Sequence, residues 1–460
     1  MAYRIDFKEL SETFKFSTDE SKKSLLTHSA GKKIKLLPYT TSEIIIDNFH
    51  GVVGGFSRVT TGKKSVDYDS EQLIGEATAN VETGKTGEIA AIIRELLFHE
   101  DGELVNAHPY FFNYIKSEKN EMKIGQFLSD IFISEDVKEK IVELNKNEPQ
   151  NVLLNLMYKS LPKMEELSKS NKSTYTLYLA EIQKQFEEDI VFLLQNNDLF
   201  LEHFEQLLRY YFFYYVSQFI LHLDNFEDGK ENIAVYYNLD WESRGKSRNS
   251  YKQGWKVIAP KLPKLFAHIN CLEMLNHMQG CEGLIRYTDF KQIVADSTEE
   301  EKQLLADDLE QLISEYKEKV KDVVWSQHHP PYPKSEEDIF NLIKELFYAI
   351  NYQFANSTRS RANEKYYKGF ESFAKKFFLK KSGPLGYTLN LKQDFLIFLT
   401  KLCIKNAEKI ALNDLFTKFN SRGIYFDRDS KKAIVELYEK LNLLEKKSDS
   451  GDAQYVKYIL

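Results

Sequence analysis

One stretch of this 460-residue chain, residues 204–256, limits the folds that the protein can adopt. It opens with apolar residues at helical spacing and includes six consecutive aromatic residues at 210–215. A helix that is apolar on nearly every side must lie inside a core. A short run of β-type composition follows at 233–241, and a basic segment begins at Arg244. We therefore expect a buried central helix that supports a charged surface segment.

The composition favours a soluble protein with substantial cores. The chain is 42% apolar and 13% aromatic, and a chain of this length has room for roughly two to four domains. Its three cysteines are too few for a disulfide-stabilised scaffold, which indicates a reducing compartment. The N-terminus lacks the apolar core of a signal peptide, and no apolar run reaches the roughly 20 residues that span a bilayer. We expect a cytoplasmic protein without membrane association.

Most of the chain carries helical patterns. Residues 1–120 are less regular: 34–39 and 43–47 are compatible with short strands, and the glycine-rich residues 51–58 with a turn. We expect a small mixed α/β region there. Residues 121–381 predict a helical body that contains a short β and basic segment at 233–264.

Residues 382–460 predict a separate C-terminal domain, because the Ser-Gly-Pro-Leu-Gly sequence at 382–386 is typical of a domain boundary. The patterns follow in the order helix, strand, helix, turn at Gly423, helix and two strands. That order is typical of a winged helix-turn-helix, which places its second helix in the major groove of DNA. The expected fold is therefore mainly α, with a multi-helical body and a C-terminal winged helix-turn-helix.

The basic segment provides the main argument for DNA binding. Its cations occur without any acid among them: Arg244, Lys246, Arg248, Lys252, Lys256, Lys261 and Lys264. Cations attract phosphates, and the interleaved Trp241, Tyr251 and Trp255 can stack on bases. Two alternatives are docking on an acidic partner protein and a solvated loop whose tryptophans are core anchors.

The expected winged helix is only weakly basic. Its second helix and its hairpin carry cations that stand among acids: Arg428, Lys431, Lys432, Lys446 and Lys447. Winged helices also dock proteins, so contact with DNA and contact with protein both remain open for this domain.

Motifs for nucleotide or metal binding are weak. Residues 79–86 end in Gly-Lys-Thr like a phosphate-binding loop, but the acidic residues before them do not suit the buried strand that such a loop follows. Four residues have zinc-ligand chemistry, yet on one continuous helix the first two face away from the last two. These are His268, Cys271, His277 and Cys281. We expect no cofactor and no metal.

A nuclease motif is also incomplete. Asp240 and Glu242 would lie on the same side of a strand, but Arg244 stands where a lysine is needed. We expect this acid pair to form salt bridges with nearby cations, and we favour a non-enzymatic role.

The chain resembles the DptG family of DNA phosphorothioation-dependent restriction proteins. The resemblance lies in Asn-Leu-Asp-Trp-Glu-Ser at 238–243, Gly-Trp-Lys at 254–256, the aromatic run that ends at 214–218, and the tail at 444–457. It implies a subunit of a bacterial three-protein complex that attacks DNA lacking sulfur in its backbone. It also implies DptF-like and DptH-like partners that carry the NTPase machinery.

These observations together predict a non-catalytic subunit that binds double-stranded DNA and bridges the NTPase partners. Two alternatives remain: a nuclease subunit whose site forms only in the complex, and a protein scaffold that never touches DNA.

Overall fold

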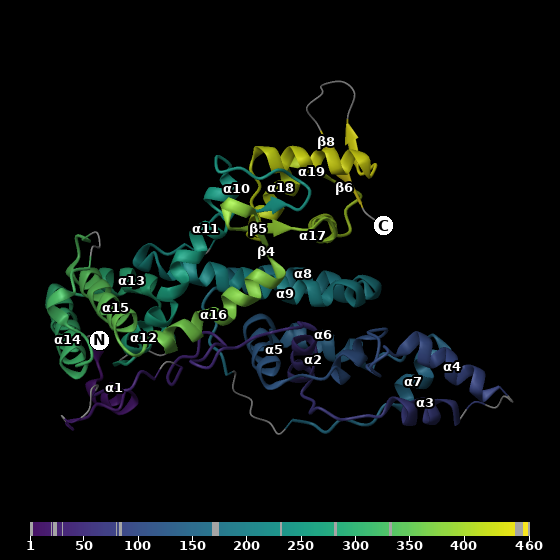
Figure 1. Ribbon diagram of the computed structural model, residues 1–460, viewed down its shortest axis with the longest axis horizontal. Coiled ribbons are helices and arrows are strands. Elements are labelled where there is room, and N and C mark those ends of the chain that lie inside the picture. The colour runs from purple at the N-terminus through teal and green to yellow at the C-terminus, as the bar shows by residue number, and fades with distance from the viewer. Residues whose placement is uncertain are drawn as a thin grey trace.

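The computed structural model describes residues 3–19, 21, 25–29, 31–79, 81, 85–167, 174–230, 232–279, 283–330, 334–446 and 454–458. Helices dominate, and the strands are short (Figure 1), which confirms the mainly α prediction. Within these ranges, no helix combines the length and the apolar character needed to cross a lipid bilayer.

The central helix α9, Asn197–Leu223, is buried as expected. Every residue from 210 to 223 is buried. Aromatic rings from neighbouring helices pack around it: α5 (Lys119–Phe132), α8 (Ala180–Leu194), α16 (Ser360–Phe377) and α17 (Gln393–Ile404). The ring pairs include Phe127–Phe212, Phe186–Tyr211, Phe212–Phe373 and Tyr210–Phe395. Burial of such large rings outweighs the modest helix propensity of aromatic residues.

The predicted glycine-rich turn at 51–58 is wrong, because these residues lie in α2, His50–Thr61. A Cβ at Gly54 would collide with the carbonyl oxygen of Ile115, and one at Gly125 of α5 would lie 2.5 Å from the backbone nitrogen of Phe56. The glycines therefore let α2 and α5 approach closely. This packing outweighs a helix-propensity cost of about 1 kcal/mol per glycine.

The strands predicted at 34–39 and 43–47 are also absent, because these residues are irregular. Most of their apolar side chains are buried, although Ile45 is exposed, and their backbone has no neighbouring strand among the described residues. At the start of the first segment, the buried carboxylate of Glu273 accepts backbone hydrogen bonds from Ile34 (3.3 Å) and from the two residues before it, Lys32 (2.9 Å) and Lys33 (2.6 Å). The described strand of this region is β1, Arg4–Ile5, which pairs antiparallel with β3, Met278–Gln279.

Two further groups of helices lie toward the two ends of α9 (Figure 1). At one end lie α1 (Phe7–Thr13), α12 (Leu265–Leu275), α13 (Phe290–Asp296), α14 (Glu299–Lys319) and α15 (Asp338–Asn356). At the other end, a smaller core is formed by α3 (Ser70–Ala79), α4 (Thr86–Leu97), η1 (Pro109–Tyr114) and α7 (Val152–Ser160). Helix α6, Glu135–Lys146, contacts α2 and α8.

The C-terminal elements follow the predicted order. After α17 come β6 (Lys409–Ala411), α18 (Leu412–Ser421), α19 (Arg428–Lys440), β7 (Leu444–Lys446) and β8 (Gln454–Lys457). The three strands form an antiparallel sheet in the order β6-β8-β7.

Residues 233–239 fasten these C-terminal elements to the body. Strand β2, Asn238–Leu239, pairs parallel with β5, Tyr387–Leu391, which pairs antiparallel with β4, Leu379–Lys381. On its other side, the segment exchanges backbone hydrogen bonds with Tyr425. The N–H of Tyr237 donates to the carbonyl oxygen of Tyr425 (3.0 Å), and the N–H of Tyr425 donates to the carbonyl oxygen of Val235 (3.2 Å). One continuous core runs through both parts.

Candidate nucleic-acid interface

The basic segment folds into short helical turns that are anchored by apolar residues. Two turns, α10 (Asn249–Lys252) and α11 (Trp255–Ile258), precede the 3-10 helix η3, Ala259–Lys264. Trp255 is buried, whereas Trp241 is 41% exposed. A Cβ at Gly254 would collide with the carbonyl oxygen of Ser250, so glycine is required between the two turns. One of the two tryptophans is thus a core anchor, and the other lies at the surface.

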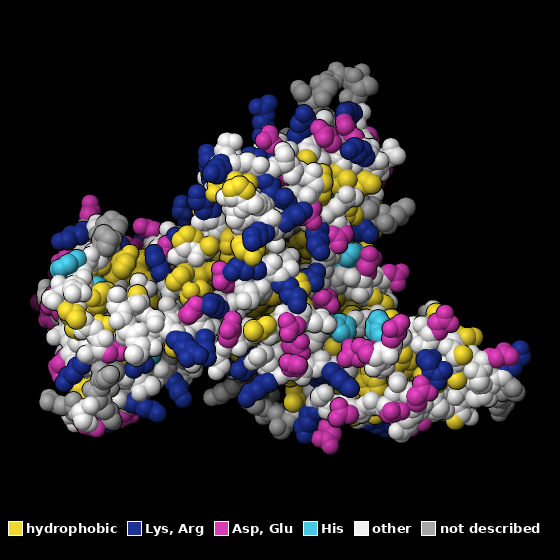
Figure 2. Space-filling view, in the orientation of Figure 1, with side chains coloured by type: hydrophobic (Ala, Val, Ile, Leu, Met, Phe, Trp, Pro, Cys, Tyr) yellow, Lys and Arg dark blue, Asp and Glu magenta, His cyan; other side chains and the backbone are white. Residues whose placement is uncertain are grey.

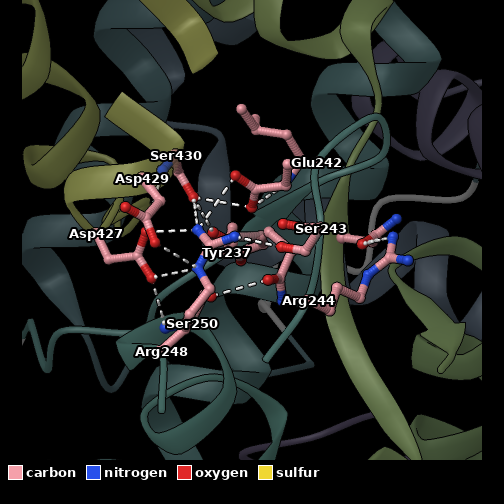
Figure 3. A network of polar contacts seen from close by, with 12 residues as sticks. Tyr237, Glu242, Ser243, Arg244, Arg248, Ser250, Asp427, Asp429 and Ser430 are labelled. Carbon is pink, nitrogen blue, oxygen red and sulfur yellow. Dashed lines mark hydrogen bonds and ion pairs between the residues drawn. The ribbon is translucent and has the colours of Figure 1, made fainter. Parts of the chain in front are cut away.

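Arg248 is the centre of a polar network at the start of α19 (Figure 3). Its guanidinium contacts the two carboxylate oxygens of Asp427 at 2.5 and 3.0 Å, and Glu242 at 3.1 Å. It also donates to the carbonyl oxygen of Ser243 (2.6 Å) and to the hydroxyl of Ser430 (2.7 Å). The Arg248 side chain is only 9% exposed. These acceptors occupy the guanidinium, so Arg248 is not the open phosphate contact that its sequence neighbourhood predicts.

Asp427 joins the two elements. It caps α19 by accepting a hydrogen bond from the N–H of Ser430 (3.1 Å), and it also accepts one from the N–H of Ser250 in α10 (3.3 Å). Burial acts to raise the pKa of Asp427. The hydrogen bonds from Arg248, Ser430 and Ser250 outweigh that effect and hold the pKa well below its ordinary value. The carboxylate therefore stays charged and fixes the start of α19 against the basic segment.

Three other cations of the segment also have partners within the protein. Lys261 and Lys264 both contact Asp224, at the end of α9, with the Lys264 ammonium at 2.8 Å. Burial acts to raise the pKa of Asp224, but hydrogen bonds from the two lysines lower it overall. Arg244 donates to the amide oxygen of Asn390 in β5 at 2.8 Å. These contacts hold the segment on the body.

The remaining cations of the segment point to solvent. Lys246, Lys252 and Lys256 are exposed, and the Lys256 ammonium lies 5.0 Å from the ring centre of Tyr251. Figure 2 shows Lys and Arg side chains gathered over the region of α10 and α11. These three lysines are the part of the basic segment that is available to an external polyanion.

Helix α19 adds further exposed cations at its start. Arg428, Lys431 and Lys432 are exposed, although Lys431 also lies 5.0 Å from the ring centre of Phe416. Lys432 is 3.9 Å from Glu436. We define the α10–α19 basic face as Lys246, Lys252, Lys256, Arg428, Lys431 and Lys432.

The hairpin contributes less. Lys446 forms an ion pair with Glu439 at 2.6 Å, and Lys447 lies outside the described residues. Asp429, Glu436 and Glu439 lie on the same helix as the α19 cations, so the positive charge of the face is strongest on the α10 side.

The predicted salt bridges of the two acids after β2 are present. Glu242 pairs with Arg248, and Asp240 lies 3.6 Å from Lys380 of β4. The carboxylates of Asp240 and Glu242 thus form ion pairs with basic side chains of the protein.

The alternative motifs do not assemble into sites within the described part of the chain. Helix α3 occupies residues 70–79, where a phosphate-binding loop would need a strand, and residues 82–84 lie outside the described ranges. His268 contacts the hydroxyl of Tyr287, and His277 contacts Glu273 and Thr13. Cys281 is not among the described residues, and those that are described include no cluster of three or more metal-ligating side chains.

Sequence reasoning missed Asp427. The side chain that caps α19 belongs to Asp427. Its distance of 179 residues from Arg248 leaves no local signal for their pairing.

Comparison with known proteins adds no identification, because no family model matches the chain and no match was found among curated proteins.

Proposed function

We propose that this protein is a non-catalytic, DNA-binding subunit of a bacterial phosphorothioation-dependent restriction complex. The DNA-binding part of the proposal rests on the α10–α19 basic face. The assignment to a restriction complex rests on the sequence resemblance in residues 238–256 and 444–457. In that assignment the protein acts in the cytoplasm and bridges duplex DNA to DptF-like and DptH-like NTPase subunits.

We take the C-terminal elements as a winged helix-turn-helix. Helices α18 and α19 would form the helix-turn-helix, and strands β7 and β8 the wing. Residues at the start of the second helix reach base edges and phosphates in such domains. Arg428, Lys431 and Lys432 occupy that position here.

One observation carries the DNA-binding proposal most directly: Asp427 binds Arg248 of the basic segment and caps α19 at the same time. The exposed lysines of the segment and the cations of α19 therefore belong to one rigid surface. When the elements that carry the cations are already fixed relative to each other, binding to phosphates has only the ordering cost of the side chains themselves.

The mixed charge of α19 favours a second candidate, a protein-docking scaffold. Asp429, Glu436 and Glu439 alternate with the cations along this helix. A surface of alternating charge suits a protein partner better than a uniformly negative duplex.

A gel-shift assay combined with a nicking assay separates the classes of function. Purified full-length protein is mixed with duplex DNA, with and without Mg²⁺. Retardation of the duplex without nicking supports the proposal, and nicking supports a nuclease subunit. The absence of both retardation and nicking supports the scaffold. Co-purification with DptF-like and DptH-like subunits tests the bridging role: failure to bind either one contradicts it.

A further inference from the structure

A cavity of about 290 Å³ opens where α9, the end of α16, strand β5 and the start of α17 meet. Its lining includes Phe377, Phe378 and Phe395 together with several polar side chains. The polar side chains are Gln206, Arg209, Lys376, Asn390, Lys392 and Asp394. Three of them are cations and one is an acid, so the lining carries excess positive charge.

Arg209 is the most constrained cation of this cavity. Its guanidinium lies 5.0 Å from the ring centre of Phe377 and pairs with Glu205 at 3.2 Å. A guanidinium has five N–H donors in a planar fork. Within the described ranges, Glu205 is its one hydrogen-bond acceptor. The ring and Glu205 thus orient Arg209 and leave donors for a further acceptor.

The start of α17 faces the same cavity. This helix has 12 residues, and its N-cap residue, Lys392, makes no capping hydrogen bond with its side chain. The first backbone N–H groups of a helix lack internal acceptors and attract anions. Lys392 and Asp394 line the cavity on either side of the first helical residue. The cationic side chains and the helix start therefore converge on one place.

We propose that this cavity is a phosphate-binding site. A phosphate group has the tetrahedral oxygens that a guanidinium fork, two ammonium groups and backbone N–H groups recognise together. Lys376 also contacts the exposed Asp47, which leaves Arg209 and Lys392 as the principal ligands. The repulsion of Asp394 limits the affinity for any anion.

The phosphate belongs either to a polynucleotide backbone or to a free phosphate or mononucleotide. The cavity adjoins the basic segment, because Asn390 binds Arg244 and Asp240 as well as lining the cavity. None of its residues belongs to the α10–α19 basic face, so this inference goes beyond the proposed function and does not require it.

Isothermal titration of the full-length protein with inorganic phosphate, at low ionic strength, tests the site. We expect one phosphate per chain. Lys392→Gln should weaken binding by about tenfold, because the neutral side chain cannot supply a charge-assisted hydrogen bond. Asp394→Asn should tighten binding by removing the repulsion, an effect that mere structural damage does not produce. Lys159→Gln, at an exposed lysine of α7 outside both the cavity and the α10–α19 basic face, should leave phosphate binding unchanged.

A 20-base-pair duplex distinguishes the two sources of the phosphate. If Lys392→Gln weakens duplex binding and inorganic phosphate competes with the duplex, the site takes the DNA backbone. If phosphate binds but Lys392→Gln leaves duplex binding unchanged, the site takes a free phosphate or mononucleotide. Two results would overturn the inference. In the first, phosphate does not bind, and Lys392→Gln leaves duplex binding unchanged. In the second, Asp394→Asn and Lys392→Gln shift the affinity for phosphate in the same direction.

Discussion

Arg422 and Asp189 form a bidentate ion pair, with nitrogen–oxygen distances of 2.5 and 2.8 Å, inside the core. Their side chains are 4% and 0% exposed. The hydroxyl of Tyr211 donates to the same carboxylate at 2.7 Å. The pair connects α8 to the turn that follows α18. The C-terminal elements are thereby fixed to the helix bundle that surrounds α9.

Removal of one partner from this pair should be costly. Arg422→Met leaves the carboxylate of Asp189 buried without its counter-ion, and we expect the free energy of unfolding to fall by about 3–5 kcal/mol. Urea unfolding followed by circular dichroism measures the change. Addition of Asp189→Leu should recover part of this stability, because the unpaired charge is then gone. Stability equal to wild type in Arg422→Met would contradict this role.

Arg248 should act on α19 through Asp427. In Arg248→Gln we expect faster amide hydrogen exchange in the first turn of α19 and in α10, because the cluster that connects them loses its cation. Lys432→Gln, on the exposed side of α19, is the matched control and should not change exchange in α10. Unchanged exchange at Ser430 in Arg248→Gln would show that the network does not hold the helix start.

Acid should weaken the contact between Arg248 and Asp427. Because the pKa of Asp427 is lowered in the folded protein, its stabilising effect is complete above about pH 4 and is lost as the pH falls further. Asparagine remains a good helix cap, so Asp427→Asn removes mainly the charge. The stability difference between wild type and Asp427→Asn should shrink between pH 4 and pH 2. A difference that is constant over this range would refute the assignment.

The close approach of α2 and α5 depends on glycine. Gly125→Ala places a Cβ 2.5 Å from the backbone nitrogen of Phe56, which cannot move aside cheaply, and should destabilise the protein by about 1–3 kcal/mol. Gly75 in α3 is the control, since a Cβ there meets nothing within 4 Å. Gly75→Ala should stabilise by up to about 1 kcal/mol through helix propensity. Thermal unfolding of both variants measures the contrast, and equal shifts would contradict this explanation.

The buried central helix was predictable because its signal is local. Six consecutive aromatic residues, 210–215, cannot be solvated, and a single helix accounts for them. The order of the C-terminal elements was also predictable, because turn and cap residues separate them in the sequence. The glycines at 51–58 misled the prediction, because local turn propensity says nothing about a neighbouring helix that requires close approach.

The partners of the cations in the basic segment could not be predicted from the sequence. From the sequence all seven stand equally free of acids. Arg248, Lys261 and Lys264 nevertheless find carboxylates on distant elements, with Asp427 179 residues away from Arg248. Only the three-dimensional structure separates the lysines that face solvent from the cations that hold the segment in place.

The salt dependence of duplex binding tests the α10–α19 basic face most directly. The logarithm of the binding constant should fall linearly with the logarithm of salt concentration, and each lysine–phosphate interaction that is removed should reduce the slope by about 1. A triple variant should therefore bind the duplex more weakly and show a flatter slope. It combines Lys246→Ala, Lys252→Ala and Lys256→Ala. The control is the triple alanine variant of Lys140, Lys159 and Lys184, which are exposed lysines of α6, α7 and α8. Equal slopes and affinities in both variants would contradict the account.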